Sequence, residues 1–140
     1  MFSYGLLPRL VIGLLATALV ATAPPVQAAP AVQTLTEKDS GETVTLTVGD
    51  KLRLNLRNPA SGGYTVLTPA YDANILKLSY RRDFPPEKRP QPRLGDFGRI
   101  EFVWEARQPG ETEVTVNIAR PWEKSKPPEQ FVKIRVVVVK

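Results

Sequence analysis

Apolar and polar residues alternate along most of the chain after residue 28, with the period of two that β-strands require. The clearest segments are 44–48 and 52–56, where valine or leucine alternates with threonine, arginine or asparagine. The same alternation recurs in four further segments, at 76–80, 100–104, 114–118 and 132–136. No segment after residue 28 has a convincing helical periodicity. Strands at roughly ten-residue spacing, joined by connections with glycine and proline, predict an all-β, immunoglobulin-like antiparallel β-sandwich.

Three details of this pattern make separate predictions. The Gly49-Asp50 turn between the first two segments is typical of a β-hairpin. In the segment 76–80 the alternation places Tyr80 on the same inward face as Leu76 and Leu78. The last segment becomes uniformly apolar at 137–139, as a strand covered on both faces would.

Three irregular segments interrupt the strands, and each carries glycine, proline or aromatic residues. They are 58–64, 81–98 and 120–130. If consecutive strands run in opposite directions, all three lie at one end of the sandwich, and the connections at 49–50, 70–74 and 108–110 lie at the other. Loops gathered on a rigid scaffold commonly form a binding site, so this end is predicted to be a recognition surface.

The N-terminal segment has the features of an export signal. Arg9 precedes the apolar run 10–20, and Val26-Gln27-Ala28 has the small-x-Ala form that signal peptidase cleaves. We expect residues 1–28 to be a signal peptide and residues 29–140 to be one domain, periplasmic or secreted, monomeric and free of the membrane after cleavage. An uncleaved anchor is the alternative, but the run is shorter than the ~20 residues of a membrane span. Cysteine is absent, which excludes disulfides.

The charge of the chain is modest. The full chain carries +5, and loss of Arg9 with the signal leaves 18 basic against 14 acidic residues, or +4. Nucleic-acid binding requires a denser basic face, so no nucleic-acid partner is expected. Six basic residues nevertheless cluster around the second irregular segment: Arg81, Arg82, Lys88, Arg89, Arg93 and Arg99. They form either a solvated surface or a binding surface for an acidic partner.

The residues of common enzyme sites are missing. Without histidine and cysteine the chain lacks the usual general base, the thiol nucleophile and typical zinc ligands. Ser61 has no nearby lysine to act as its base, and only Asp96 and Glu123 offer a pair of carboxylates for glycoside cleavage. We therefore expect a protein that is not an enzyme and that has no metal and no cofactor.

The three irregular segments together resemble the chagasin family, small secreted or periplasmic inhibitors of papain-like cysteine proteases. That family carries an Asn-Pro-Thr-Thr-Gly-aromatic loop, a Gly-x-x-Gly-type loop and an Arg-Pro-Trp loop. The matching residues here are Asn58, Pro59, Ala60, Ser61, Gly62, Gly63 and Tyr64, then Gly95, Asp96, Phe97 and Gly98, then Arg120, Pro121 and Trp122. The likeness covers nearly all of the mature chain. The first loop departs from the family in reading Ala-Ser for Thr-Thr and in carrying one extra residue, Gly63.

The resemblance implies a reversible, competitive inhibitor whose partners are papain-like cysteine proteases. Its first loop, Asn58 to Tyr64, would occupy the active-site cleft, and the other two loops would grip the sides of the cleft. Two other functions use the same loops: an envelope adhesion or assembly module, and a weak carbohydrate binder or glycosidase built on Trp122. Taken alone, Trp122 has a third explanation, as a buried cap on the end of the sandwich.

Overall fold

The computed structural model describes residues 29–140 and the isolated residues 18 and 21, so the predicted signal peptide at 1–28 lies almost entirely outside the described residues. This part of the chain forms eight strands and two short 3-10 helices. They are β1 (Val32–Leu35), η1 (Glu37–Asp39), β2 (Thr43–Thr47), β3 (Lys51–Arg57), η2 (Pro59–Gly62), β4 (Thr65–Val66), β5 (Leu76–Phe84), β6 (Arg99–Ala106), β7 (Gly110–Ala119) and β8 (Glu129–Val139). None of the helices described is long and apolar enough to span a membrane.

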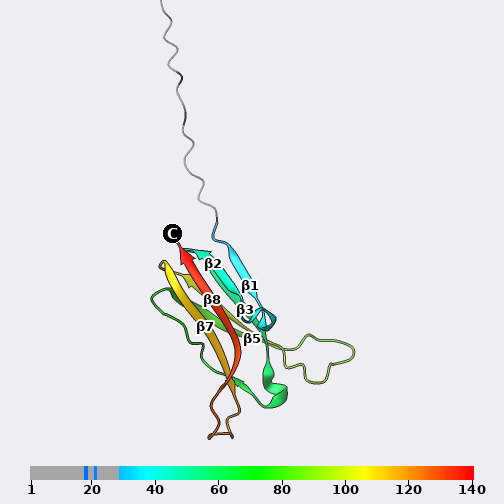
Figure 1. Cartoon of the computed structure of the whole chain (residues 1–140). Helices are drawn as coiled ribbons and strands as arrows, with labels where there is room; N and C mark the ends of the chain where they lie inside the picture. Colours follow the sequence, from blue (N-terminus) through cyan, green and yellow to red (C-terminus); the bar gives the residue numbers. More distant parts are fainter. Residues whose placement is uncertain (1–17, 19–20, 22–28) are drawn as a thin grey trace, which may run out of the picture.

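The strands form two sheets that pack face to face (Figure 1). One sheet has the order β1-β3-β6-β5, and the other has the order β2-β8-β7-β4. The predicted all-β sandwich is therefore confirmed. The sheets are mixed rather than wholly antiparallel, because β1 pairs in parallel with β3 and β2 pairs in parallel with β8. Strand direction could not be predicted, because the alternation pattern is the same for parallel and antiparallel strands. The strand β1 has no buried residue, so its sequence shows no alternation.

The predicted hairpin between β2 and β3 is wrong. These strands belong to different sheets, so the turn between them carries the chain across the sandwich. Asp50 holds this turn: its carboxylate accepts the backbone N–H groups of Thr47 (2.9 Å) and Ala31 (3.0 Å). Gly49 donates its N–H to the carbonyl of Ala106 on β6 (2.9 Å). A Gly-Asp turn between two amphipathic strands is compatible both with a hairpin within one sheet and with a connection between two sheets.

The core lies between the two sheets and contains most of the inward residues that the alternation predicted. Val48 is an exception, because it follows the end of β2 and is 42% exposed. Leu52, Leu54 and Leu56 of β3 are fully buried and face valine and isoleucine side chains of β7 and β8. Trp104 of β6 is also fully buried, and its ring stacks on Phe102 with 5.7 Å between the centroids. Burying side chains of this kind contributes roughly 1.5–3 kcal/mol each.

The apolar end of β8 is not covered on both faces. Val138 is buried, whereas Val137 is half-buried and Val139 is 42% exposed, so the inward-outward alternation of the strand continues to its end. The interpretation of a doubly covered strand was therefore wrong. The neighbouring β2 contributes Thr45 and Thr47 opposite these valines, and no further layer of the described chain covers them.

A β-bulge in β5 corrects the prediction for Tyr80. The pairing with β6 shifts between Leu78 and Tyr80, which places Tyr80 opposite Val103 rather than on the inward face. Arg81 consequently lies opposite Phe102, in a position that faces the other sheet. Its guanidinium lies 5.6 Å from the centre of the Phe102 ring. One extra residue reverses the facing of every later side chain in a strand, and the hydrophobic pattern does not reveal it.

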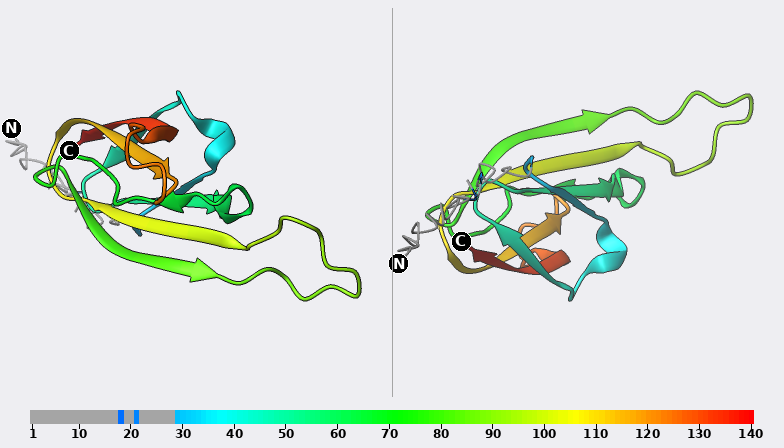
Figure 2. Two further views of the ribbon diagram at one scale, coloured as in Figure 1. Left: turned by 90° about the horizontal axis from the view of Figure 1, so that it is seen from below. Right: turned by 90° about the horizontal axis from the view of Figure 1, so that it is seen from above.

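The three irregular segments lie at the same end of the sandwich, as predicted. Figure 1 shows η2 and the β7–β8 connection at the end away from the C-terminus. The segment between β5 and β6 projects beyond the rest of the described chain in both views of Figure 2. Backbone hydrogen bonds from Arg107 to Ile75 (2.8 Å) and from Gly49 to Ala106 (2.9 Å) join the other connections at the opposite end.

The packing at Gly98 predicts a measurable cost for any side chain at this position. Gly98 has φ +87°, and a Cβ atom there would overlap the carbonyl oxygen of Phe84. Gly41 has φ +95° with no atom within 4 Å of the same position, so Gly41→Ala is a matched control. Both substitutions should cost about 1–2 kcal/mol for the left-handed backbone. Gly98→Ala should cost at least about 1 kcal/mol more, because the backbone must move.

Urea denaturation of the two variants and of the unaltered protein, all lacking residues 1–28, measures these losses. Equal losses in the two variants would contradict the close approach of Gly98 to Phe84.

Candidate functional site

The first loop is held in a defined turn by its own residues. Asn58 caps the 3-10 helix η2, because its side-chain oxygen accepts the N–H of Ala60 (3.0 Å). Pro59 follows as the first helical residue and is buried. Gly63 ends the helix in the left-handed conformation, φ +78°, and donates its N–H to the carbonyl of Ala60 (2.8 Å). The sequence predicted a turn here but not a helix, and the cap leaves Ser61 exposed at the apex.

The Arg-Pro-Trp segment forms a β-turn. Glu123 donates its N–H to the carbonyl of Arg120 (3.0 Å), which places Pro121 at the second turn position, where its fixed φ is favoured. Trp122 occupies the third position, at the corner of the turn. Its side chain is 65% exposed, so Trp122 is not a buried cap of the sandwich.

The first and third loops are joined by two direct contacts. The Nε of Arg120 donates to the carbonyl of Gly62 (2.8 Å), and its guanidinium lies 4.4 Å from the centre of the Tyr64 ring. The six-membered ring of Trp122 occupies the space that a Cβ atom on Gly63 would need. Gly63, the residue that distinguishes this first loop from the family pattern, is therefore the residue against which the Trp122 side chain packs.

Tyr64 extends this connection to the start of β8. Its ring is half-buried against the core, and its hydroxyl donates to a carboxylate oxygen of Glu129 (3.3 Å). The guanidinium of Arg120 also lies 3.4 Å from Glu123, so this arginine contacts both loops and is only about one third exposed. The sequence showed Tyr64 and Arg120 as motif residues, but not that they stack on each other.

The second loop contacts the first through backbone atoms. Asn58 donates its N–H to the carbonyl of Gly98 (3.0 Å), and a Cβ atom placed on Gly95 would lie 3.7 Å from the Cβ of Ser61. Asp96 shapes the loop, because its side chain accepts the N–H of Gly98 (3.0 Å). The structure therefore brings together all three segments that the sequence singled out.

The exposed surface of these loops is mostly apolar or small. Phe97 is 49% exposed and Trp122 is 65% exposed, and Ser61 and Gly62 of the first loop are also exposed. An exposed tryptophan on a constrained turn is the kind of residue that dominates protein–protein interfaces. This arrangement suits the binding of another protein.

The chemistry of the site does not suit catalysis. Asp96 is occupied by the backbone of its own loop, and Glu123 lies 3.4 Å from both Arg120 and Lys126, so the two carboxylates do not form a pair. Ser61 has no hydrogen-bonded base among the described residues. Within 29–140 no three acidic side chains are grouped closely enough to hold a metal ion.

The six basic residues around the second loop have different surroundings. Arg81, Arg89 and Arg99 each form an ion pair, with Asp83, Glu87 and Glu37 respectively. Arg82 lies over the rings of Tyr80 and Phe84, at 5.2 and 5.8 Å from their centres. Lys88 and Arg93 have no ion pair within the described part of the chain. The charge of the cluster is thus only partly neutralised.

Sequence reasoning overlooked one apolar residue near the site, Leu94, which is completely exposed. A leucine directly after the proline-rich, charged segment 85–93 was the available signal, because nothing in that segment predicts a core for it to join. Phe84 is 39% exposed and also borders the second loop; the sequence had included it only in the Phe84-Pro85-Pro86 stretch that resembles the family.

Comparison with known proteins places these loops in a family. A match to the family described as Chagasin family peptidase inhibitor I42 spans residues 45–136. Amoebiasin-2 of Entamoeba histolytica is 28% identical over 108 residues, which cover 77% of this chain and 86% of that protein.

Solved structures show the same fold. The crystal structure of the cysteine protease inhibitor EhICP2 from Entamoeba histolytica matches with a TM-score of 0.64 and 25% identity, over 81% of this chain and 100% of that chain. PbICP-C, solved in complex with falcipain-2, matches with a TM-score of 0.51 and 17% identity, over 80% of this chain and 93% of that chain, and supports the fold alone.

The family match agrees with the non-catalytic function expected from the sequence, since proteins of this family inhibit peptidases and are not enzymes. The matched region spans more than half of the chain. The chain therefore belongs to the chagasin family of peptidase inhibitors.

Proposed function

We propose that the mature protein is a reversible, competitive inhibitor of papain-like cysteine proteases. The observation that carries this proposal is the joining of the three motif loops into one exposed surface, with Trp122 seated on Gly63 and Arg120 bound to Gly62. Membership of an inhibitor family and the likeness to the cysteine protease inhibitor EhICP2 support it.

In this mechanism the first loop blocks the active-site cleft. Its apex consists of Ser61 and Gly62, which are small and exposed, so the backbone approaches the thiol closely. Trp122 of the third loop and Phe97 of the second loop are both exposed and provide rigid apolar area for the walls of the cleft. The cap on η2 and the buried Pro59 order the loop before binding, which reduces the entropy lost in the complex.

The loop remains uncut because its backbone is not extended. Residues 59–62 form a 3-10 turn closed by the hydrogen bond from Gly63 to Ala60 (2.8 Å). Attack by a thiolate requires the scissile carbonyl to be aligned with the nucleophile at close range. A turn fixed at both ends holds the carbonyls of Ala60 and Ser61 away from that alignment.

We also propose that the protein acts outside the cytoplasm, as a periplasmic or secreted monomer. The N-terminal pattern ending at Ala28 motivates this proposal, together with the absence of cysteine. The strands from β1 to β8 have a core of their own between the two sheets.

Residual activity of a panel of papain-like proteases tests the proposed inhibition. Micromolar mature protein should inhibit at least one member, with a competitive pattern against a peptide substrate. In the same assay Trp122→Ala should weaken inhibition about thirtyfold, corresponding to about 2 kcal/mol, because a large exposed anchor is lost from the interface.

Val48→Ala is the matched control, because Val48 is 42% exposed and lies at the opposite end of the sandwich. It should leave inhibition unchanged, and thermal melts should show that all variants fold. A folded protein that inhibits no member of the panel would reject the proposal and favour the envelope-binding function.

Gly63 should act through Trp122, and a double-mutant cycle tests this dependence. Gly63→Ala should weaken inhibition at least about tenfold, because the new methyl group displaces the indole from its seat. In a protein that already carries Trp122→Ala, the same change should have little further effect. Gly49→Ala controls for the backbone, since Gly49 has φ +95° in open space. Additive losses would mean that Gly63 acts independently of Trp122.

Export of the full chain should be accompanied by cleavage after Ala28. If the chain with all 140 residues is produced in a Gram-negative host, periplasmic material should begin at Ala29 and behave as a monomer in size-exclusion chromatography. N-terminal sequencing of the fractionated protein decides the outcome. A protein found in the membrane fraction with Met1 retained would support the uncleaved anchor instead.

A further inference from the structure

An open groove of about 840 Å³ lies beside the recognition loops. It is bordered by the end of β3, the start of β6 and the projecting segment 84–98. Its lining mixes apolar residues with arginines. The residues that matter here are Arg57, Phe84, Arg89, Arg93, Leu94 and Arg99. None of these six residues belongs to the three loop motifs; only Phe84 lies in a stretch, Phe84-Pro85-Pro86, that shares the resemblance to the family.

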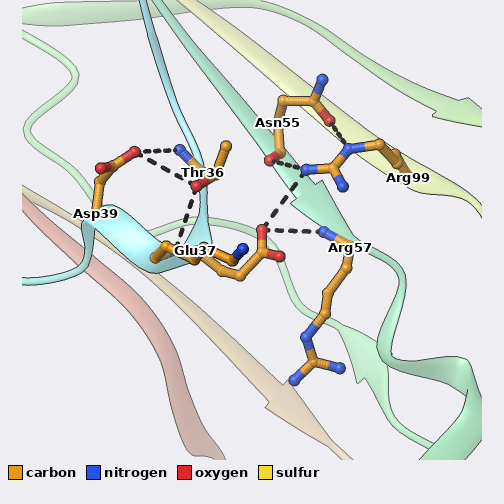
Figure 3. A network of polar contacts seen from close by, with 7 residues as sticks. Thr36, Glu37, Asp39, Asn55, Arg57 and Arg99 are labelled. Atoms are coloured by element: carbon orange, nitrogen blue, oxygen red, sulfur yellow. Dashed lines mark hydrogen bonds and ion pairs between the residues drawn. The ribbon is translucent and has the colours of Figure 1, made fainter.

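One wall of the groove is fixed by a network of polar contacts. Arg99 donates to the backbone carbonyl of Asn55 (2.7 Å) and lies 3.7 Å from a carboxylate oxygen of Glu37. The same oxygen accepts the backbone N–H of Arg57 (3.3 Å). Figure 3 shows the side chain of Arg57 directed away from this network. The charge of Arg99 is therefore partly neutralised, and that of Arg57 is not.

The lining carries an excess of positive charge. Four arginines face two carboxylates, those of Glu87 and Asp96. Glu87 pairs with Arg89 (2.8 Å), and Asp96 accepts a backbone N–H of its own loop. Neither Arg57 nor Arg93 forms an ion pair with any described residue. These two guanidinium groups can bind carboxylates on another molecule.

The apolar part of the lining is only partly covered by the described chain. The Leu94 side chain is completely exposed, and Phe84 is 39% exposed. Apolar area next to unpaired arginines is typical of protein–protein interfaces, in which arginine and aromatic residues are enriched.

The groove is continuous with the recognition loops. Asp96 and Gly98 line it, and the carbonyl of Gly98 accepts the N–H of Asn58 at the start of the first loop (3.0 Å). A protein bound to the loops would therefore have part of its surface over the groove.

We propose that the groove receives an acidic segment of the target protease, next to the cleft that the first loop blocks. The inference rests on the proposed inhibitory function and specifies its preferred target, a papain-like protease with carboxylates on the rim of its cleft. Opposite charges at this place accelerate association more than they strengthen the final complex.

Association rate constants test the proposal with two inhibited papain-like proteases, one carrying a net negative and one a net positive charge. Arg57→Glu/Arg93→Glu should slow association with the negatively charged protease about tenfold at low salt. The difference should largely vanish at about 1 M salt, where the screening length falls to about 3 Å. Association with the positively charged protease should not slow.

The matched control is Arg107→Glu/Lys140→Glu, which changes the net charge equally at the opposite end of the sandwich. Both residues are exposed and have no ion pair in the described chain. Because Arg57 also lies 5.2 Å from the centre of the Phe131 ring, Arg93→Glu alone is measured as well, and melts verify folding. Arg93→Glu should reproduce part of the slowing.

Each outcome decides a different question. If groove and control variants associate equally fast while inhibition persists, the groove proposal is wrong and the proposed function stands. Slowing that is equal for both proteases, or unaffected by salt, also overturns the groove proposal. If the unaltered protein inhibits no papain-like protease, both proposals fail together.

Discussion

Burial of apolar side chains between the two sheets is the interaction on which the rest of the structure depends. The chain has no cysteine, so no disulfide holds the sheets together. Leu52, Leu54 and Leu56 are fully buried on one side, and Val132, Ile134 and Val136 are fully buried on the other. This packing fixes where β3, β5 and β7 end, and those ends determine where the three motif loops leave the sandwich.

The loops differ in how firmly the sandwich holds them. The first and third loops are joined to each other by the hydrogen bond of Arg120 to Gly62 and by the seating of Trp122 on Gly63. The second loop is held at its base, where Gly98 accepts from Asn58 and lies against Phe84, while the segment beyond it projects outward (Figure 2). Contacts of this kind favour a rigid pair of loops beside a longer arm.

The sequence predicted the sandwich and the gathering of the loops because both follow from strand periodicity and from the number of strands. It did not predict sheet membership, since Gly49-Asp50 fits a hairpin as well as a crossing between sheets. Nor did it predict the bulge after Leu78, because one unpaired residue leaves the composition unchanged while it reverses the facing of Tyr80. Sequence patterns report which residues are buried, but strand partners depend on contacts distant in sequence.

Within the site, the motif residues were identifiable from the sequence, but the sequence did not show which of them position the others. Arg120 and Gly63 look like contact residues in the motif, yet the structure uses them to position others: Arg120 binds the carbonyl of Gly62, and Gly63 leaves room for Trp122. An extra glycine lengthens the first loop, and this length is accommodated because the indole of the third loop fills the space beside it. The orientation of the exposed indole therefore depends on Gly63, which leaves the space that the Trp122 ring occupies.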